Sequence, residues 1–473
     1  VAKTNGSNTL TFNNCLFHEN IAKGLGPVYG SWNASGTVTF NNCTMEGNVA
    51  YNGNNGFSYN WQGTVNLRNS IVRNTMHGGS SGIDLQYVTG VNVNYGSKDA
   101  NAANNTLTGT NSTSDPQFTD AANDDYTLQT GSPAIGAGNT DATATDFNGI
   151  TRPQGTNDDI GAYEYRNTWT GSSSTDWGTT GNWDQSYEPN ASTESPIIAD
   201  VTNQPVISSD DGSSNDGNVL LEDITINSGA ELTINKDSSL KLVGDFTNNS
   251  GTVTLNSDSS EFSSIIVQGS SSGNITYNRY VNSLTEGSGW DLVGSPVDGL
   301  SISSFATTNS SPLATGGGSG GNQYAIGYYD NSADDWTNYT TATIGGAGNF
   351  DIGKGYQMAT DSGATLAFTG TIATTDQTQA VQDYSGASGR IWNLVANPYP
   401  SYINANDNAD ATHNVIDVNG TSNLHDSYLY VYGYDADNSN GSLFTIINNT
   451  TAATYIAPGQ AFMVAADNAS SGT

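Results

Sequence analysis

Apolar and polar residues alternate in three similar segments near the start of the chain. The first two read TLTFNNCLFHEN from Thr9 and TVTFNNCTMEGN from Thr37, and a fainter copy, TVNLRNSIVRN, begins at Thr64. Alternation with a period of two predicts β-strands, and recurrence every 27 to 28 residues predicts stacked coils. Aligning the copies places apolar residues in columns: Leu10 with Val38 and Val65, Phe12 with Phe40 and Leu67, and Phe17 with Met45 and Val72. We therefore expect coils of a right-handed parallel β-helix with these columns inside.

An asparagine follows each alternating strand, at positions 14, 42 and 69. Asparagine tolerates the left-handed conformation of a coil corner, and its amide can bond the neighbouring coil. The next column contains Cys15 and Cys43. Since stacked coils lie about 4.8 Å apart, the two cysteines would be close enough for a disulfide. A disulfide and a stack of buried thiols both remain open.

A segment punctuated by Pro, Gly and Asp follows the coils at residues 115–165. Its motifs are Asp115-Pro116, Ser132-Pro133-Ala134-Ile135, Arg152-Pro153 and Asp159-Ile160-Gly161-Ala162-Tyr163-Glu164. The segment resembles the one that closes parallel β-helices in large bacterial surface proteins of the choice-of-anchor Q type. From the repeats we expect coils over residues 1–112, and the resemblance implies a terminal cap over 113–165.

The cap offers apolar side chains for the open end of the coil stack. We expect Ile135, Ile160 and Tyr163 to plug that end, because an uncovered stack exposes apolar side chains and unpaired strand edges. Arg152 is expected to pair with Asp146 or Asp159 in a structural role.

Residues 166–272 have a different pattern. Trp169, Trp177 and Trp183 stand among Gly, Ser and Thr, where they form either a cap on the next core or a sugar-stacking surface. Paired apolar positions then recur every eight to thirteen residues, at 224/226, 232/234, 240/242 and 253/255. This spacing, with glycines between the pairs, predicts a short second β-solenoid behind a Trp-rich cap.

A second duplication occupies the remainder of the chain. The frame W-x-L-V-x-x-P occurs at Trp290 and again at Trp392. Two further segments recur downstream in similar form: YAIGYYD as YVYGYD, and GKGYQM as GQAFMV. Three landmarks in the same order predict two equivalent β units, over 273–375 and 376–473. They would form either separate β-sandwich-like units or pseudo-symmetric halves of one domain. The predicted fold class is therefore all-β.

The Trp-rich opening and its coils resemble long adhesin-like proteins that Bacteroidota export through the type IX secretion system. The duplicated frame resembles modules that precede the C-terminal sorting domain of such proteins. The resemblance implies an extracellular location at the bacterial cell surface. We expect the chain to be a piece of a larger, processed polypeptide.

The strongly negative net charge of the chain limits the classes of molecule that it can bind. There are 45 acidic and 12 basic residues, a formal net charge of −33. Such a surface repels nucleic acid and anionic membranes. No apolar run approaches the roughly 18 residues of a transmembrane helix, so we expect neither nucleic-acid binding nor a transmembrane segment.

Acidic loops are the candidate metal sites. Loop carboxylates and carbonyl oxygens are the ligands that Ca²⁺ prefers, although solvated turns have the same composition. The candidates fall in three Gly- or Asn-containing loops: Asp210, Asp211 and Asp216; Asp330, Asp334 and Asp335; Asp435 and Asp437. We expect structural calcium in one or more of them and no other cofactor.

Parallel β-helices also include polysaccharide lyases and glycosidases, which need paired carboxylates, or calcium with a basic residue, on one outward face. Glu19 and Glu46 occupy one corner of neighbouring coils, where two acids are also typical surface charge. The histidines, at 18, 77, 413 and 425, are expected to stand apart at surface or coil positions. No catalytic residue is assigned.

The primary hypothesis is a non-enzymatic structural or adhesive segment, whose partners would be surface glycans or identical subunits. The alternative is a carbohydrate-active β-helix protein with glycan-binding accessory domains. Exposed coplanar aromatic side chains or convergent acids would favour the alternative. Buried tryptophans would favour the primary hypothesis, in which the segment is a stalk, an adhesin or a component of a surface filament. A third hypothesis is a self-assembling fibre subunit, with homo-oligomers or filaments joined through unpaired strand edges.

Overall fold

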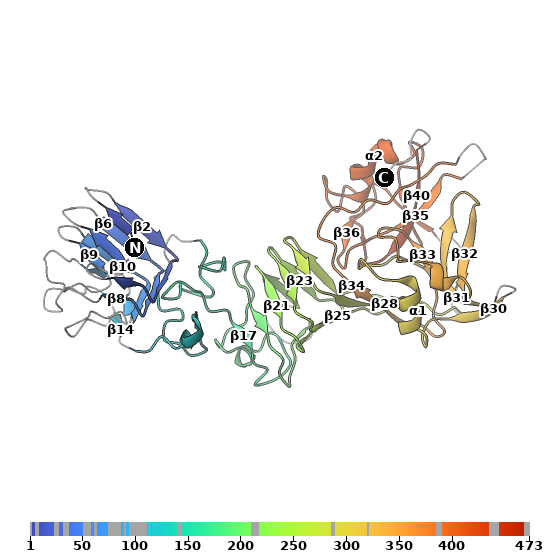
Figure 1. Ribbon diagram of the computed structural model, residues 1–473. Helices are drawn as coiled ribbons and strands as arrows, with labels where there is room; N and C mark the ends of the chain where they lie inside the picture. The colour runs from blue at the N-terminus through green and yellow to red at the C-terminus, as the bar shows by residue number, and fades with distance from the viewer. Residues whose placement is uncertain are drawn as a thin grey trace. The chain divides into compact units, whose positions relative to one another are not determined.

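The computed structural model is dominated by β-strands (Figure 1). It describes residues 2–4, 9–22, 28–31, 37–50, 58–60, 64–73, 87–88, 91–93, 111–112, 114–139, 144–209, 217–284, 289–318, 321–384, 390–434 and 444–467. Within these residues the α-helices are α1 (Ile302–Thr308) and α2 (Val415–Asn423). The chain divides into two compact units, Val1–Asn167 with Thr193–Pro196, and Thr168–Ser192 with Ile197–Thr473. The predicted all-β fold class is confirmed.

Unit 1 begins with coils whose strands pair in parallel. One sheet contains β2 (Leu10–Asn13), β6 (Thr37–Asn41) and β10 (Thr64–Arg68), and a second contains β3 (Leu16–His18), β7 (Thr44–Glu46) and β11 (Ser70–Arg73). A third consists of β1 (Ala2–Thr4), β5 (Tyr29–Ser31) and β9 (Ser58–Asn60), and β4 (Ile21–Ala22) pairs with β8 (Val49–Ala50). The register matches Leu10 to Val38 and Phe12 to Phe40, as the repeat predicts.

The aligned apolar columns form the interior of the coils. Val38, Phe40 and Met45 are fully buried, and the rings of Phe12 and Phe40 stack with centroids 5.0 Å apart. The corner prediction is also confirmed, because Asn14, Asn42 and Asn69 have φ values of 49°, 50° and 43°. This left-handed conformation is one that asparagine adopts more readily than other side chains.

Side-chain amides link the coils one position before the predicted corner column. Asn41 Nδ2 donates to Asn13 Oδ1 over 2.9 Å, whereas the buried amide of Asn42 makes no hydrogen bond within the described residues. Cys15 and Cys43 are free thiols. Their mutual hydrogen bond lowers the pKa of the Cys15 thiol to about 7, and burial raises the pKa of the Cys43 thiol.

The coil stack ends where the chain reverses. β13 (Val91–Val93) pairs antiparallel with β10, and β12 (Tyr87–Val88) pairs antiparallel with β11. β14 (Asn111–Ser112) continues the second sheet beyond β12. Backbone groups of the last parallel strands therefore bond to reversed strands.

The cap lies against the side of the coils, and the prediction that it plugs the end of the apolar column is wrong. β15 (Phe118–Asp120) and β16 (Asp125–Leu128) form its hairpin. Its core is a cluster of Ile71, Phe118, Tyr126, Leu128, Ala134, Ile160, Ala162 and Tyr163, separate from the cluster inside the coils. Ile71 lies at an outward-facing position of its coil, as does Thr44, whose hydroxyl accepts the Ala162 N–H over 2.9 Å. Both are buried, because the cap covers this face.

Unit 2 opens with a three-sided solenoid of parallel strands, seen in Figure 1 at β17, β21, β23 and β25. Its first sheet contains β17 (Thr168–Trp169), β18 (Ile197–Ile198), β21 (Ile224–Ile226), β24 (Phe246–Asn248) and β27 (Ser271–Ser272). The second contains β19 (Val206–Ile207), β22 (Glu231–Ile234), β25 (Thr252–Asn256) and β28 (Ile275–Val281). The third contains β20 (Asn218–Leu221), β23 (Ser239–Leu242) and β26 (Ser264–Val267). The paired apolar positions predicted from the sequence are at most 2% exposed, so the second solenoid is confirmed.

The solenoid continues into the β units without a break in its core. β28 pairs in parallel with β25 and, along its other edge, antiparallel with β34 (Ala364–Gly370). One hydrophobic cluster extends from Trp169 through the solenoid to Ile372. Solenoid and first β unit therefore share one core.

The two β units share one sheet path, in which the first strand pairs with the last strand, the last with the central strand, and the central strand with the strand that follows it; the first unit has one additional strand. The first sheet has the order β29 (Asp291–Val293), β33 (Tyr356–Met358), β31 (Gly321–Asp330), β30 (Thr315–Gly318), with β32 (Asp335–Thr340) also paired to β31. The second has the order β35 (Trp392–Ala396), β40 (Ala461–Ala465), β37 (Val431–Tyr434), β38 (Phe444–Ile447), and β36 (Ile403–Asn404) pairs with β39 (Tyr455–Ile456). Each unit has one α-helix between the first and the central strand of its sheet: α1 follows β29, and α2 follows β36. The predicted duplication is confirmed.

The copies pack as pseudo-symmetric halves of one domain. The Gly294 N–H donates to the Gly459 carbonyl over 2.8 Å, and the Ala396 N–H donates to the Gly353 carbonyl over 2.8 Å. In the sequence alignment Gly294 corresponds to Ala396 and Gly353 to Gly459, so these hydrogen bonds are equivalent. Leu292 and its counterpart Leu394 lie in one small cluster between the sheets.

Candidate functional site

The prediction that Glu19 and Glu46 share a corner is wrong: Glu19 has the left-handed φ of a corner, whereas Glu46 ends β7 in register with His18. The Glu19 N–H donates to the Glu46 carbonyl over 2.9 Å. The Glu46 side chain is 8% exposed and its Oε2 lies 3.2 Å from Arg73 Nε on the next coil. Arg73 also binds Asp115 of the cap over 2.5 Å and lies over the Phe118 ring. An ion-paired, buried Glu46 is a structural group joining coil to cap.

A buried polar network holds the cap together around Arg152. Its guanidinium forms an ion pair with Glu164, both side chains being fully buried, and donates to the carbonyls of Asp159 and Gly161. The structural role predicted for Arg152 is confirmed, but the predicted carboxylate partner is wrong. The Asp146 carboxylate instead accepts backbone N–H groups, including that of Glu164 over 2.9 Å.

Burial dominates the acid–base behaviour of this network. It raises the pKa of the Asp159 carboxyl to about 7 and that of Glu164 to about 8, against opposing effects of Arg152 and backbone N–H groups. The guanidinium pairs with Glu164, while the buried Asp159 carboxylate accepts the backbone N–H groups of Gly136 and Tyr165. Two buried carboxyls beside one guanidinium favour retaining a proton near neutral pH.

Of the predicted calcium loops, the structure describes the one with Asp330, Asp334 and Asp335. Asp330 ends β31, Asp334 lies in the turn, and Asp335 begins β32. Asp330 Oδ1 accepts the Ser332 hydroxyl and N–H over 2.7 and 3.0 Å, and the Tyr329 hydroxyl donates to Asp334 Oδ1 over 2.5 Å. The hydrogen bond from Ser332 lowers the pKa of Asp330. Asp210, Asp211, Asp216, Asp435 and Asp437 lie outside the described residues.

The described calcium candidates do not converge on a common point. Among the residues that the structure describes, one group of three His, Cys, Asp or Glu side chains has its ligand atoms within 4.8 Å of one another. That group is His18, Glu19 and Asp124. His18 lies on the coil strand β3, as expected of a coil position, and the structure adds two acids beside it that the sequence did not indicate. Asp124 is distant in sequence, so no local motif indicates the group.

The three tryptophans at the start of unit 2 are core residues. Trp169, Trp177 and Trp183 are 0%, 1% and 2% exposed. Trp183 lies edge-on to Trp177, with ring centroids 4.7 Å apart, and each indole N–H donates to a backbone carbonyl. Buried, hydrogen-bonded indoles close the end of the solenoid core, and they are not a sugar-stacking surface.

An exposed aromatic surface occurs instead on the second β unit, where sequence reasoning did not place it. We call it the aromatic face and define it by Trp392, Tyr428, Tyr432, Phe444 and Ile446. Tyr432 lies opposite Ile446 across the pair β37–β38, and Trp392 contacts Tyr432 edge-on at 4.8 Å. Tyr428, Phe444 and Ile446 are 41%, 41% and 51% exposed. The rings come from separate segments, and only tertiary structure brings them together.

The aromatic rings of this face are not coplanar. The Trp392 and Tyr428 planes meet at 57°, and those of Trp392 and Tyr432 at 87°. Such rings can contact separate faces of a ligand, but they do not make a flat platform.

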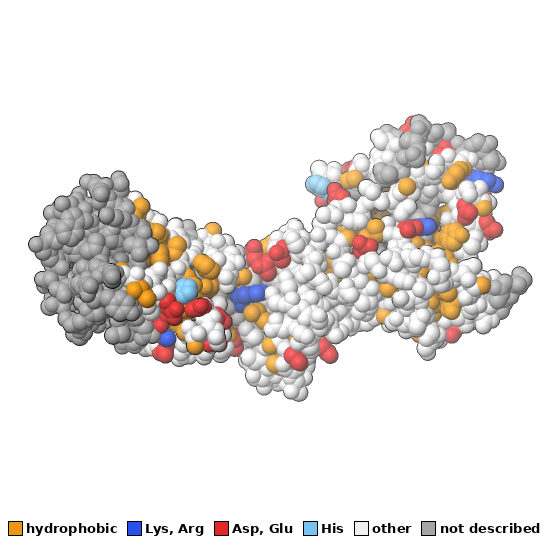
Figure 2. All heavy atoms as spheres, in the orientation of Figure 1, with side chains coloured by type: hydrophobic (Ala, Val, Ile, Leu, Met, Phe, Trp, Pro, Cys, Tyr) orange, Lys and Arg blue, Asp and Glu red, His pale blue; other side chains and the backbone are white. Residues whose placement is uncertain are grey.

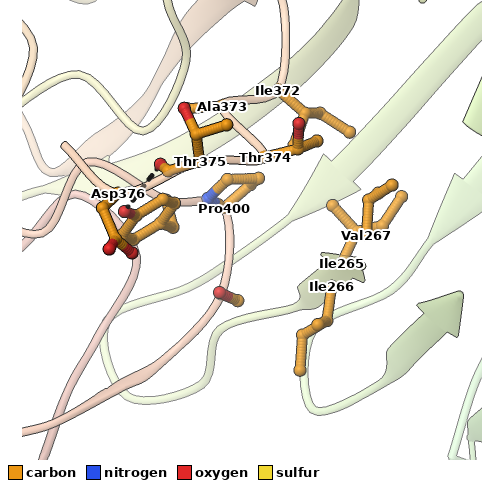
Figure 3. Close-up of a pocket in the computed structure, with 11 residues that line it drawn as sticks. Ile265, Ile266, Val267, Ile372, Ala373, Thr374, Thr375, Asp376 and Pro400 are labelled. Carbon is orange, nitrogen blue, oxygen red and sulfur yellow. Dashed lines mark hydrogen bonds between the residues drawn. The ribbon is translucent and has the colours of Figure 1, made fainter. Parts of the chain in front are cut away.

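Two of the hollows beside the second β unit share Tyr399 in their lining. One, of about 220 Å³, lies between Ile265–Val267 and the segments Ile372–Asp376 and Tyr399–Ser401 (Figure 3). There the Ile265 N–H at the solenoid edge donates to the Pro400 carbonyl over 2.8 Å, and the Tyr399 hydroxyl donates to the Thr375 carbonyl over 3.1 Å. These contacts cover the edge of β26, so the hollow marks the junction between the solenoid and the second β unit. The other, about 640 Å³, is a mainly apolar groove beside α2.

Acidic side chains are spread over the visible surface of both units, while Lys and Arg side chains are few (Figure 2). In unit 1 a histidine lies among several of these acids (Figure 2). Neither described α-helix has the length and apolar character needed to cross a bilayer.

Comparison with known proteins gives one match. Residues 168–473 match the model of a domain of unknown function, DUF8693. The match starts at the residue where unit 2 begins. No protein with a curated description and no solved structure matches the chain.

Proposed function

The chain belongs to the family DUF8693, and we propose that it is a non-enzymatic structural and adhesive segment of a larger secreted bacterial surface protein. It would act as a stalk, an adhesin piece or a component of a surface filament. Its partners would be surface glycans or identical subunits.

The main support for this proposal is that the residues recurring along the chain have structural positions. Residues repeated from coil to coil fill interior columns or left-handed corners, as Phe40 and Asn42 do. Glu46, at the end of a coil strand, is ion-paired and buried. The tryptophan cluster closes a core. Each repeated feature thereby supports the integrity of the stack.

The extracellular location rests on the resemblance of residues 115–165 to the closing segment of bacterial surface β-helices. The strongly acidic composition is compatible with it. Structural calcium in the loop of Asp330, Asp334 and Asp335, or in the other acidic loops, stays a prediction.

The aromatic face supports a second candidate function, the glycan binding of a carbohydrate-active protein's accessory domain. Exposed tyrosine and phenylalanine rings present apolar faces that can pack on the C–H surfaces of sugars. Their tilted arrangement favours contacts with a few sugar rings over adsorption to a flat polysaccharide surface.

A pull-down on immobilised polysaccharides, with and without calcium, tests the adhesive role. We expect Tyr428→Ala and Phe444→Ala to weaken retention about five- to tenfold, since truncating an anchoring aromatic removes about 1 kcal/mol or more of binding. The matched control is Tyr455→Ala, because Tyr455 is 54% exposed but lies in β39, outside the aromatic face. If the control weakens retention as much as the two variants, the aromatic face is not the binding surface.

A further inference from the structure

A histidine and two carboxylates meet where a coil corner touches the cap of unit 1. His18 ends β3 and Glu19 follows it with φ 50°. Asp124 precedes β16 in the cap, with φ 64°. The ligand atoms of all three lie within 4.8 Å of one another, although Asp124 is more than one hundred residues away along the chain.

The His18 ring nitrogen facing this cluster has no hydrogen bond. Nδ1 of His18 lies 3.3 Å from Asp124 Oδ1, yet it is buried and makes no hydrogen bond to a described protein group. A buried polar atom that makes no hydrogen bond is rare and costly. The close approach of a nitrogen and an oxygen without a hydrogen bond is compatible with two ligands around one cation.

The measured separation agrees with tetrahedral coordination. With metal–nitrogen and metal–oxygen distances near 2.1 Å, two ligands of a tetrahedral site lie about 3.4 Å apart. The His18–Asp124 distance of 3.3 Å already equals that edge. The Glu19 carboxylate lies within 4.8 Å of both ligand atoms and would have to move closer to complete such an edge.

The surroundings favour a cation. Two carboxylates carry the cluster's negative charge, and the Tyr126 hydroxyl donates to Asp124 Oδ1 over 3.3 Å. The Tyr126 ring packs beside the His18 ring, with centroids 5.4 Å apart, which helps to fix both ligands. A divalent ion would neutralise the two carboxylates while imidazole binds in its neutral form.

We propose that His18, Glu19 and Asp124 bind a divalent transition-metal ion of the zinc class. A nitrogen ligand disfavours calcium, which takes oxygen ligands, and one imidazole with two carboxylates is a donor set that zinc accepts. The ion would link the coil corner to the cap, as Arg73 does nearby through Glu46 and Asp115. This site is separate from the acidic loops considered for calcium.

Zinc titration of the full chain, by calorimetry and by competition with a chromophoric chelator, tests the proposal. We expect one zinc per chain at this site, and affinity at least about tenfold weaker in His18→Gln, Glu19→Gln and Asp124→Asn. The isosteric changes at Glu19 and Asp124 keep the shape of the side chain, so loss of binding would not reflect unfolding. Circular dichroism of each variant checks this directly.

The chain provides a matched control in His413, which is 83% exposed and lies 3.7 Å from Asp410 in unit 2. This pair has the same chemistry without a third ligand, so His413→Gln should leave zinc affinity unchanged. Zinc should also slow amide exchange in β3 and β16, which it would link. Unchanged affinity in all three site variants, or no binding by the wild-type chain at millimolar zinc, would overturn the proposal.

Discussion

The pseudo-symmetric packing of the β units makes a specific prediction at Gly294. A Cβ added there would lie 2.3 Å from the Cβ of Ala396, its counterpart in the other half, and 2.9 Å from the Lys354 carbonyl oxygen. Its φ is not in the left-handed region, so space excludes a side chain at this position. We predict that Gly294→Ala destabilises the domain and that Ala396→Gly partly restores it.

The magnitudes follow from the contacts. In Gly294→Ala, overpacking should lower the free energy of unfolding by about 1–3 kcal/mol. The smaller conformational freedom of the unfolded chain should raise it by about 0.4–1 kcal/mol. Ala396→Gly alone should cost about 1–2 kcal/mol, from a buried methyl and added backbone freedom. In the double variant the Cβ–Cβ clash disappears, while the contact with Lys354 remains. The two changes should therefore couple by at least about 1 kcal/mol, beyond the roughly 0.5 kcal/mol scatter of independent sites.

Native-state amide exchange of the full chain measures this locally. The opening free energies of β29 and β35 should fall in Gly294→Ala and recover partly in the double variant. β22, in the solenoid, provides the internal reference. Strictly additive effects, or a stable Gly294→Ala variant, would refute the proposed packing of the two halves.

Three further predictions concern the cores and edges. Trp177→Ala should destabilise unit 2 by about 3–5 kcal/mol in urea unfolding while leaving glycan retention of the folded protein unchanged; selective loss of retention would restore the sugar-stacking interpretation. Burial raises the folded-state pKa values of Asp159 and Glu164 to about 7 and 8, above their unfolded values near 4. The contribution of the two groups to stability should therefore be complete below about pH 4 and decline as the pH rises through 7 and 8. Glu164→Gln should flatten this dependence in exchange of the cap, corrected for intrinsic rates, and an identical profile would argue against it. Ile446→Lys, on β38 at the end of its sheet within the described residues, should reduce any self-association seen by sedimentation, because charge on an edge strand opposes pairing; unchanged association would place the contact elsewhere.

Much of the fold could be predicted from the sequence because stacked coils repeat the same environment. Each coil places Phe12, Phe40 and Leu67 in one column, so a local pattern specifies a long-range contact. The W-x-L-V frame similarly revealed two copies of one topology.

Features formed by distant segments were not predictable in this way. The cap covers an outward face through Ile71, which periodicity alone marks as solvent-facing. Arg152 selects Glu164 because backbone N–H groups already occupy Asp146. His18 and Asp124 come together only because the cap packs against the coils. They are too far apart in the sequence for a local motif to predict the contact.

The most direct test of the structural and adhesive role is to incubate the full chain with a panel of polysaccharides, with and without calcium. Retention on the polysaccharide and release of new reducing or unsaturated ends would both be measured. Our account predicts retention, or neither effect, and no released product. Product release that disappears in Glu46→Gln would contradict it and would make the end of this coil strand a catalytic site.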